Sequence, residues 1–438
     1  MANDRDLSEL KGKMKRAAID CWMADTGFYP HIGNSKIYAK WGWMLNFYNR
    51  PDENGRGGGD GNGVTASVEA EFDAIRRAID ALVDRWLDLP DGSECDDPLQ
   101  RAKTTANTLG ASGGPGSGES TGDISTANNT VHEVTINKLV GSFRAPFLDK
   151  YFTQFSTVQG ELAAACMILQ TNYGAEREMW PAARVDASKL CERALQAWIA
   201  QQEQESDVNA TMALTTVSAV AGVVTSLATA GAETIASVTA LSAIAGSATI
   251  AIQGISSDVD VRGGSYQEIF QSLTEGFEKL DSVLKSQEHA LNKMLRDTLA
   301  MMYSDMSRFN LDAFVLGSYP ISDGTMRMER SDTQIIVNNM KRIADSLTQA
   351  VSTLQNAPAR NPTPRDGSLG SGSNGTHTAA SELWNRASRC LALTTSEYER
   401  GTSLFQATVE DFFQADAEAA RIVAEIMAAE ALTERFDR

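Results

Sequence analysis

The C-terminal part of the chain, residues 384–426, reads WNRASRCLALTTSEYERGTSLFQATVEDFFQADAEAARIVAEI. Apolar and small residues recur there every three or four positions, from Trp384 through Phe405 to Ile426, without a slip in phase. This spacing places them along one face of an α-helix, because the helix has 3.6 residues per turn. We therefore expect one long C-terminal helix over residues 379–438.

Four earlier stretches show the same spacing, at residues 68–89, 132–202, 266–301 and 336–354. No comparable stretch alternates with the period of two that is typical of a half-buried strand. The sequence therefore predicts an all-α protein without a sheet. We expect an elongated helical bundle of long amphipathic helices with a central hydrophobic helical hairpin.

Runs rich in Gly, Pro and Ser divide the chain into segments. The predicted segments are an aromatic-rich N-terminal helical segment (1–49), a Gly-rich linker (50–64), a helical hairpin region (65–203) with a disordered insertion (108–130), a hydrophobic helical hairpin (204–257), long helices (264–357), a flexible linker (358–378) and the long C-terminal helix (379–438).

The chain of 438 residues is acidic, with 57 Asp and Glu against 39 Lys and Arg and a formal net charge of −18. Such a charge repels phosphate backbones, so nucleic acid is not an expected partner. The five cysteines are scattered and show neither a disulfide pattern nor the spacing of a zinc site. The N-terminus has no apolar segment before a cleavage site, so we expect no cleaved signal peptide.

Residues 212–255 contain a single charged residue, Glu233. Each half has close to the ~20 residues that span a bilayer, and a turn at 231–233, beginning with Gly231, would make a helical hairpin. The small residues, Gly222 and Gly246 among them, permit two interpretations. The halves are either buried helices that pack closely, or a hairpin that is stored against the bundle and enters a membrane with Glu233 at its tip.

The first 49 residues are rich in aromatic side chains, including Trp22, Trp41 and Trp43. These aromatics either pack against the bundle or form a docking surface for a partner protein or a neighbouring subunit, because aromatic anchors dominate interface energetics. The sequence alone leaves both interpretations open.

Motifs for catalysis are not found in the sequence. The four histidines lie far apart, and the Gly-rich run at 113–118 lacks the Gly-Lys-Ser/Thr ending of a phosphate loop. We expect a protein that is not an enzyme, with no catalytic residues, no metal ligands and no cofactor. Its activity would then depend on its surfaces.

Two short motifs carry a resemblance to a known family. Leu139, Val140 and Gly141 occupy the place of a Trp-x-Gly turn between two helices, and Phe412 and Asp416 match a Tyr-x-x-x-Asp/Glu pattern with Phe in place of Tyr. In these features the chain resembles the WXG superfamily, the helical substrates of type VII secretion in actinobacteria. The resemblance implies export to the cell envelope or the medium without a cleaved signal, with Phe412 and Asp416 as the export motif.

The long helices that flank a mid-chain apolar hairpin also resemble α-helical pore-forming toxins. The first expectation is therefore a non-enzymatic secreted protein that acts by binding partner proteins or by assembling into a homo-oligomer. The alternative is a pore-forming or membrane-inserting protein whose 212–255 hairpin contacts lipid.

Overall fold

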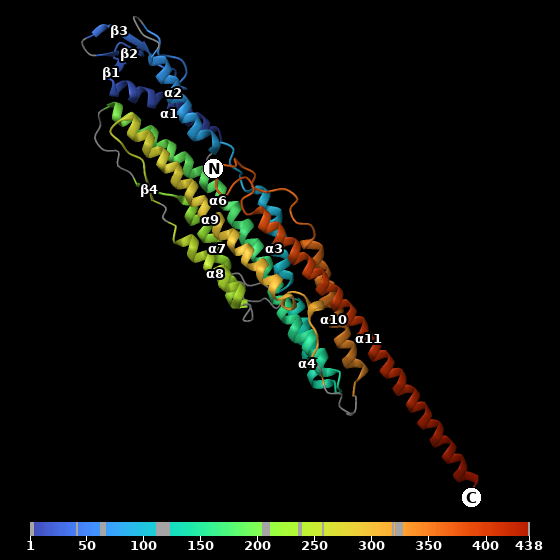
Figure 1. The fold of residues 1–438 in the computed structure, drawn as a ribbon. Helices are drawn as coiled ribbons and strands as arrows, with labels where there is room; N and C mark the ends of the chain where they lie inside the picture. The colour runs from blue at the N-terminus through green and yellow to red at the C-terminus, as the bar shows by residue number, and fades with distance from the viewer. Residues whose placement is uncertain are drawn as a thin grey trace.

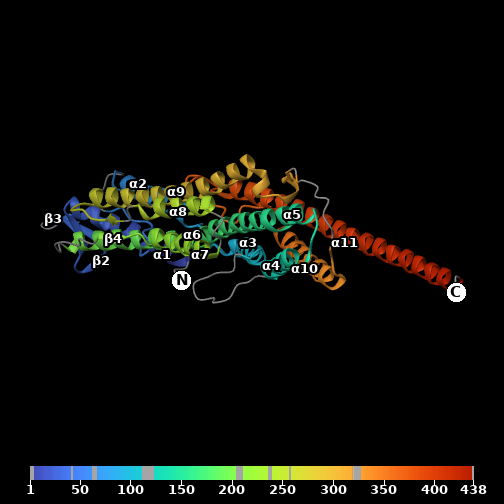
Figure 2. The same ribbon diagram turned by 90° about the horizontal axis from the view of Figure 1, so that it is seen from below.

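A computed structural model of the chain describes residues 4–40, 43–61, 67–110, 123–203, 211–234, 239–255, 258–317, 319 and 327–436. The fold is mostly helical, as predicted, and long helices follow a common axis in two perpendicular views (Figures 1 and 2). A small sheet lies at one end, and the C-terminal helix extends from the other end (Figure 1).

The helices are α1 (Asp4–Asp25), α2 (Ser67–Val83), α3 (Asp96–Thr108), α4 (Asp123–Lys138), α5 (Arg144–Leu148), α6 (Phe155–Glu203), α7 (Thr215–Thr234), α8 (Thr239–Gln253), α9 (Tyr266–Ser304), α10 (Arg330–Leu354) and α11 (His377–Phe436). The strands are β1 (Phe28–His31), β2 (Asn34–Lys40), β3 (Trp43–Asn49), β4 (Thr211–Ala213) and β5 (Asp258–Asp260). Short turns of helix are η1 (Asp84–Trp86), η2 (Ser93–Cys95), the π-helical η3 (Asp149–Gln154), η4 (Met306–Arg308) and η5 (Leu311–Ala313).

Helix α6 is the centre of the fold, where it contacts α1, α3, α7, α9 and α11. Its large side chains are buried along the whole length, including Phe155, Trp180 and Trp198. The helix passes through Pro181 without ending. Burial of apolar surface on several sides of one long helix explains why the neighbouring helices align with it.

The prediction of a helical N-terminal segment without a sheet is wrong beyond Asp25. Strands β1, β2 and β3 pair antiparallel in chain order. Tyr38 on β2 is fully buried, and its hydroxyl donates a hydrogen bond of 2.5 Å to Asp20 on α1. Arg50 also binds Asp20, through Nε at 2.8 Å, so α1 and the sheet share one buried carboxylate. Aromatic residues favour strands, which accounts for the sheet in this aromatic-rich stretch.

A second pair of strands closes the apolar hairpin at its base. Strand β4 pairs antiparallel with β5, with Met212 opposite Val259. Both of these side chains are buried. This ribbon also departs from the prediction of a protein without strands, and three-residue strands are too short for a periodicity test to detect.

The predicted linker at 50–64 is an ordered loop in its described part, residues 50–61. The backbone N–H of Asn49 donates to the carbonyl of Asp60 at 2.7 Å, and that of Gly59 donates to the carbonyl of Asn49 at 2.8 Å. Arg76 on α2 donates from Nε to the carbonyl of Gly55 at 2.7 Å. The Gly-rich composition therefore marks tight turns and not a free spacer.

The other two predicted flexible segments also differ from the structure. Helix α4 begins at Asp123, so the last residues of the predicted insertion at 108–130 are helical, whereas residues 111–122 lie outside the described residues. The predicted linker at 358–378 is ordered throughout, and its Arg365, Leu369 and Thr376 are buried. We call residues 357–376 the strap, because they pack across α6 and α9 before α11 begins.

Candidate interaction surfaces

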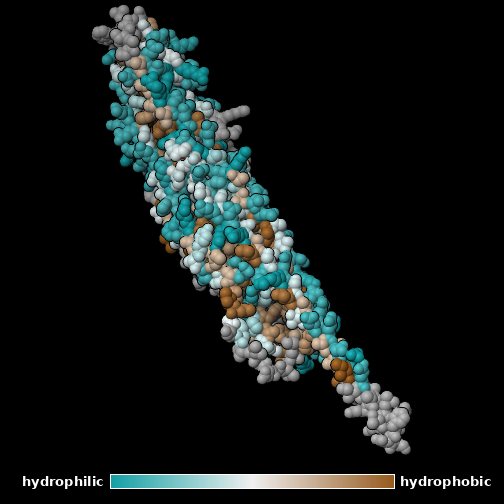
Figure 3. Space-filling view, turned by 45° about the vertical axis from the view of Figure 1, so that its right-hand side comes forward, coloured by the Kyte–Doolittle hydropathy of each residue, from teal (hydrophilic) through white to brown (hydrophobic). Residues whose placement is uncertain are grey.

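The C-terminal half of α11 leaves the body of the molecule (Figures 1 and 2). Every residue from 414 to 425 is exposed. Ile422 is 44% exposed and Val423 is 55% exposed. Figure 3 shows hydrophobic residues on this part of the helix, beyond the mostly hydrophilic body. Large apolar side chains on an unsupported helix are a feature of an interaction surface.

The two residues of the predicted export motif lie where α11 leaves the body. Asp416 is exposed, but Phe412 is half-buried and packs against the core. Its ring meets that of Phe413 edge to face at 5.4 Å between centroids, and the guanidinium of Arg330 lies 4.6 Å from the ring centroid of Phe413. Part of the Phe412 side chain therefore packs against the body, whereas Asp416 is the fully exposed member of the pair.

The predicted turn at Leu139, Val140 and Gly141 lies between α4 and α5. Leu139 is buried, Gly141 has φ 146°, and Val140 forms an antiparallel bridge to Arg327. A positive φ is easily adopted only by glycine, which explains why the chain reverses here.

The two arms that this turn joins run antiparallel. Gln159 and Ser125 are hydrogen-bonded at 3.3 Å, Asn128 donates to Ser156 at 3.0 Å, and the rings of His132 and Phe152 stack at 3.7 Å. Each pair along this series lies nearer to Gly141, as expected for a helical hairpin.

The apolar segment forms a hairpin of α7 and α8, which contact each other and lie on α6 and α9. Asp186 of α6 holds the start of α7. Its carboxylate accepts hydrogen bonds from the backbone N–H groups of Thr215 and Thr216, both at 2.9 Å, and from their hydroxyls at 2.7 and 2.6 Å. A carboxylate at a helix N-terminus satisfies free N–H groups and interacts favourably with the helix dipole.

Only one face of the hairpin is buried. Val220 and Val224 are buried on α7, whereas Ser218 and Gly222 are exposed and Ile250 on α8 is 74% exposed. Among the described residues, no atom lies within 4 Å of a Cβ atom added at Gly222 or Gly246. These glycines therefore do not mediate the close helix packing that was one interpretation of the sequence.

The turn of the hairpin differs from the predicted position. Gly231 and Glu233 belong to α7, which continues to Thr234, and residues 235–238 lie outside the described residues. In the described ranges, no helix is both long enough and apolar enough to cross a membrane.

The predicted docking aromatics fall in different places. Trp22 is half-buried on α1 and meets Phe72 of α2 edge to face at 6.2 Å, so it contributes to packing. Trp43 belongs to β3. Trp41 lies outside the described residues.

Sequence reasoning missed a buried charged cluster beneath the strap. Arg365 of the strap forms an ion pair with Glu288 of α9, and both side chains are fully buried. The Arg365 guanidinium also lies 4.1 Å from the ring centroid of Trp180. Ser371 donates its backbone N–H to Glu288 at 2.6 Å, and Gly370 donates to Asp281 at 2.8 Å.

A second carboxylate on α6 completes this cluster. Glu176 accepts hydrogen bonds from Trp180 Nε1 at 2.7 Å, from Thr363 at 3.2 Å and from Thr376 at 3.1 Å. Burial and the nearby Glu176 raise the pKa of Glu288 to about 7, although Arg365 opposes the shift. No motif of fixed spacing in the sequence indicates this cluster, because its residues lie on three elements that are far apart in the chain.

The described cysteines are poor nucleophiles. All five are buried, and burial raises the pKa of Cys21 and of Cys166 to about 12. In the part of the chain that the structure describes, no group of three or more His, Cys, Asp or Glu side chains is placed to hold a metal ion. Comparison of the chain with protein-family models, with curated proteins and with solved structures finds no match.

Proposed function

We propose that this chain is a non-enzymatic, secreted interaction protein, an elongated helical bundle that assembles with a second copy of itself through the free end of α11. The observation that carries this proposal is the exposure of α11 from residue 414 to residue 425. Isolated helices are marginally stable in water, and most helices in proteins are stabilised by packing of an apolar face. A partner would supply that packing.

The stripe on this part of α11 suits a second copy. Phe412, Ala415, Ala419, Ile422 and Ile426 follow one another at steps of three and four. In an antiparallel pair related by a two-fold axis, Phe412 faces Ile422 of the other copy, and the two alanines face each other. Large residues then meet large ones at the ends while small residues allow close approach in the middle, and the stripe from Phe412 to Ile422 is covered by one closed contact.

Ile422→Asp tests this assembly. We expect the wild-type protein to be a dimer by light scattering after size-exclusion chromatography, and the variant to be a monomer, because the new carboxylate would be buried in the contact. Ala424→Asp is the matched control, since it adds the same charge on the opposite face of an exposed turn. A wild-type monomer at every concentration, or equal effects of the two variants, would contradict assembly through this stripe.

We also propose that the chain is exported by a type VII system. Substitution of Asp416 tests this part of the proposal. Asp416→Ala removes the exposed carboxylate of the motif and leaves the packing of Phe412 in place. In a host that carries the secretion system, we expect the variant to accumulate inside the cells with an unchanged thermal unfolding temperature. Normal secretion of this variant would remove the support for the motif.

Membrane insertion of the α7–α8 hairpin is a second candidate function. The observation that favours it is the attachment of the hairpin, which is buried on one face and closed at its base by β4 and β5, so that it can leave the bundle without unwinding α6 or α9. Release of dye from lipid vesicles by the wild-type protein, reduced in Glu233→Lys, would support it. Vesicles that stay sealed at all pH values would argue that the hairpin remains on the bundle.

A further inference from the structure

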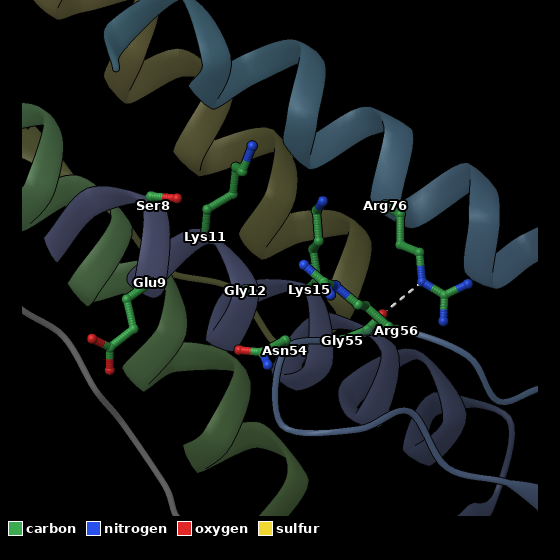
Figure 4. Close-up of a pocket in the computed structure, with 9 residues that line it drawn as sticks. All are labelled: Ser8, Glu9, Lys11, Gly12, Lys15, Asn54, Gly55, Arg56 and Arg76. Atoms are coloured by element: carbon green, nitrogen blue, oxygen red, sulfur yellow. Dashed lines mark hydrogen bonds between the residues drawn. The ribbon is translucent and has the colours of Figure 1, made fainter. Parts of the chain in front are cut away.

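A cleft of about 710 Å³ opens between α1, the loop after β3, and α2 (Figure 4). Lys11 and Lys15 of α1, Arg56 of the loop and Arg76 of α2 line it. None of the motifs singled out in the sequence includes these residues. The volume lies in the range of small-molecule sites, ~300–1,000 Å³.

The loop approaches α1 closely because residue 55 is a glycine. Gly55 has φ 71°, and a Cβ atom there would lie 2.5 Å from Cβ of Lys15. Arg76 holds the loop from the other side, through the hydrogen bond from its Nε to the carbonyl of Gly55 (Figure 4). The cleft therefore has three walls, formed by α1, the loop after β3 and α2, and these contacts hold the walls in place.

The lining of the cleft is positively charged. Its one carboxylate, Glu9, points away from Lys11 and Lys15 in Figure 4 and forms an ion pair of 2.7 Å with Lys13 outside the cleft. Four cationic side chains therefore face the space with no acidic lining residue directed into it. Carboxylates outside the lining balance three of these charges, because Lys11 and Lys15 pair with Asp80 and Asp84, and Arg76 pairs with Asp73.

Acidic residues behind the cleft hold the two lysines in position. Lys11 Nζ lies 2.5 Å from Asp84 and 3.1 Å from Asp80, and Lys15 Nζ lies 2.6 Å from Asp80. Burial lowers the pKa of Lys11, but its hydrogen bonds to Asp84 and Asp80 outweigh burial and raise the pKa, so the ammonium stays charged. An ammonium has three N–H donors, and these contacts do not use all of them.

Arg56 supplies the uncommitted charge. Its side chain is exposed, and its guanidinium makes no hydrogen bond or ion pair with the residues that the structure describes. A guanidinium offers five N–H donors in a fork that matches phosphate oxygens. It lies at the mouth of a cleft whose lysines are already oriented.

We propose that this cleft binds a small, multiply charged ligand that carries phosphate groups. Lys11 and Lys15 act as fixed point charges at one wall, and Arg56 closes on the ligand from the loop. A small polyanion contacts all three at once, whereas the acidic surface elsewhere repels it. This site is independent of assembly through α11, because the free end of α11 lies at the other end of the molecule (Figure 1).

Isothermal titration calorimetry on the full chain, with inorganic phosphate, pyrophosphate and citrate as probes, tests the proposal. We expect one pyrophosphate per chain, bound more tightly than phosphate or citrate. Arg56→Gln should weaken pyrophosphate binding at least about tenfold, because it removes the one lining cation that has no ion-pair partner among the described residues. Lys36→Gln on the exposed part of β2 removes the same charge from the same end of the molecule, and should change the affinity less than about twofold.

Lys15→Gln provides a second variant at the opposite wall, with thermal unfolding as a check that the fold is retained. Weakened binding in both cleft variants, with normal binding in Lys36→Gln, supports the site. Absence of heat with all three probes would overturn it, and so would equal losses in Arg56→Gln and Lys36→Gln. Citrate bound more tightly than pyrophosphate would overturn the assignment to phosphate.

Discussion

At the scale of single residues, the raised pKa of Glu288 makes one contribution to stability depend on pH. Burial and the neighbouring Glu176 raise its pKa from 4.5 to about 7 in the folded state. The contribution of Glu288 to stability is therefore fully present below the unfolded pKa and is lost as the pH rises through about 7. The sign is opposite to that of an ordinary surface carboxylate with a lowered pKa.

Glu288→Gln removes this titration while keeping the size of the side chain. We expect the unfolding temperature of the wild type, relative to that of this variant, to fall between about pH 5 and about pH 8. Glu278→Gln, at an exposed position of the same helix, should show no such trend. Parallel curves for the wild type and Glu288→Gln, measured by calorimetry across this range, would show that Glu288 does not titrate there.

The packing of the strap against α9 also depends on Gly370. Its φ is 58°, and a Cβ atom there would collide with the carboxylate of Glu288. Gly370→Ala should therefore destabilise the protein by about 2–4 kcal/mol in urea unfolding, from backbone strain and overpacking. Gly367→Ala is the control, because no atom of the described residues lies within 4 Å of its new methyl group, and its effect should stay within about 0.5 kcal/mol. Equal unfolding of the two variants would mean that the strap does not lie against Glu288.

At the scale of elements, the α7–α8 hairpin is a surface unit with one covered face. Gly222 and Gly246 are helical, and neither has an atom of the described residues within 4 Å of the position that an added methyl group would take. Gly222→Ala and Gly246→Ala should each stabilise the protein by about 0.5–1 kcal/mol, because alanine has the higher helix propensity and no neighbour opposes it. Gly174→Ala on α6 should gain less, since its methyl group would lie 3.1 Å from Val223. A loss of stability at Gly222 in thermal unfolding would restore the close-packing interpretation.

At the scale of the whole molecule, the net charge of −18 opposes assembly of two copies. The exposed part of α11 is acidic too, with Asp416, Glu418 and Glu425 against Arg421. Salt screens repulsion between exposed charges, so dimerisation should strengthen between about 50 mM and about 500 mM NaCl. Sedimentation equilibrium measures this dependence. A dimer that weakens as salt is added would indicate a contact held by opposite charges, in place of the apolar stripe.

The long periodic helices could be predicted from the sequence, because helical spacing is a local property that repeats over many residues. The stretch from Trp384 to Ile426 lies within α11, and the turn near Gly141 separates α4 from α5. Strands β1, β4 and β5 were missed because they are short, and β2 and β3 were missed because the pairing shifts in register at Pro30/His31 and Ala39/Lys40, which breaks the alternation. The cationic cleft was missed because its residues come from three separate segments.

The sequence by itself determined that most of the chain is helical and where the long helices lie. The spacing of apolar residues that predicts a helix can be read from neighbouring positions in the chain. Only the tertiary structure decided what the Gly- and Pro-rich segments do. Their composition predicts flexible segments, but order in the strap comes from hydrogen bonds to Glu176 and Glu288, and Arg365 is buried because Glu288 lies opposite it. Such contacts join residues far apart in the chain, and no local pattern records which distant partner will satisfy a buried charge.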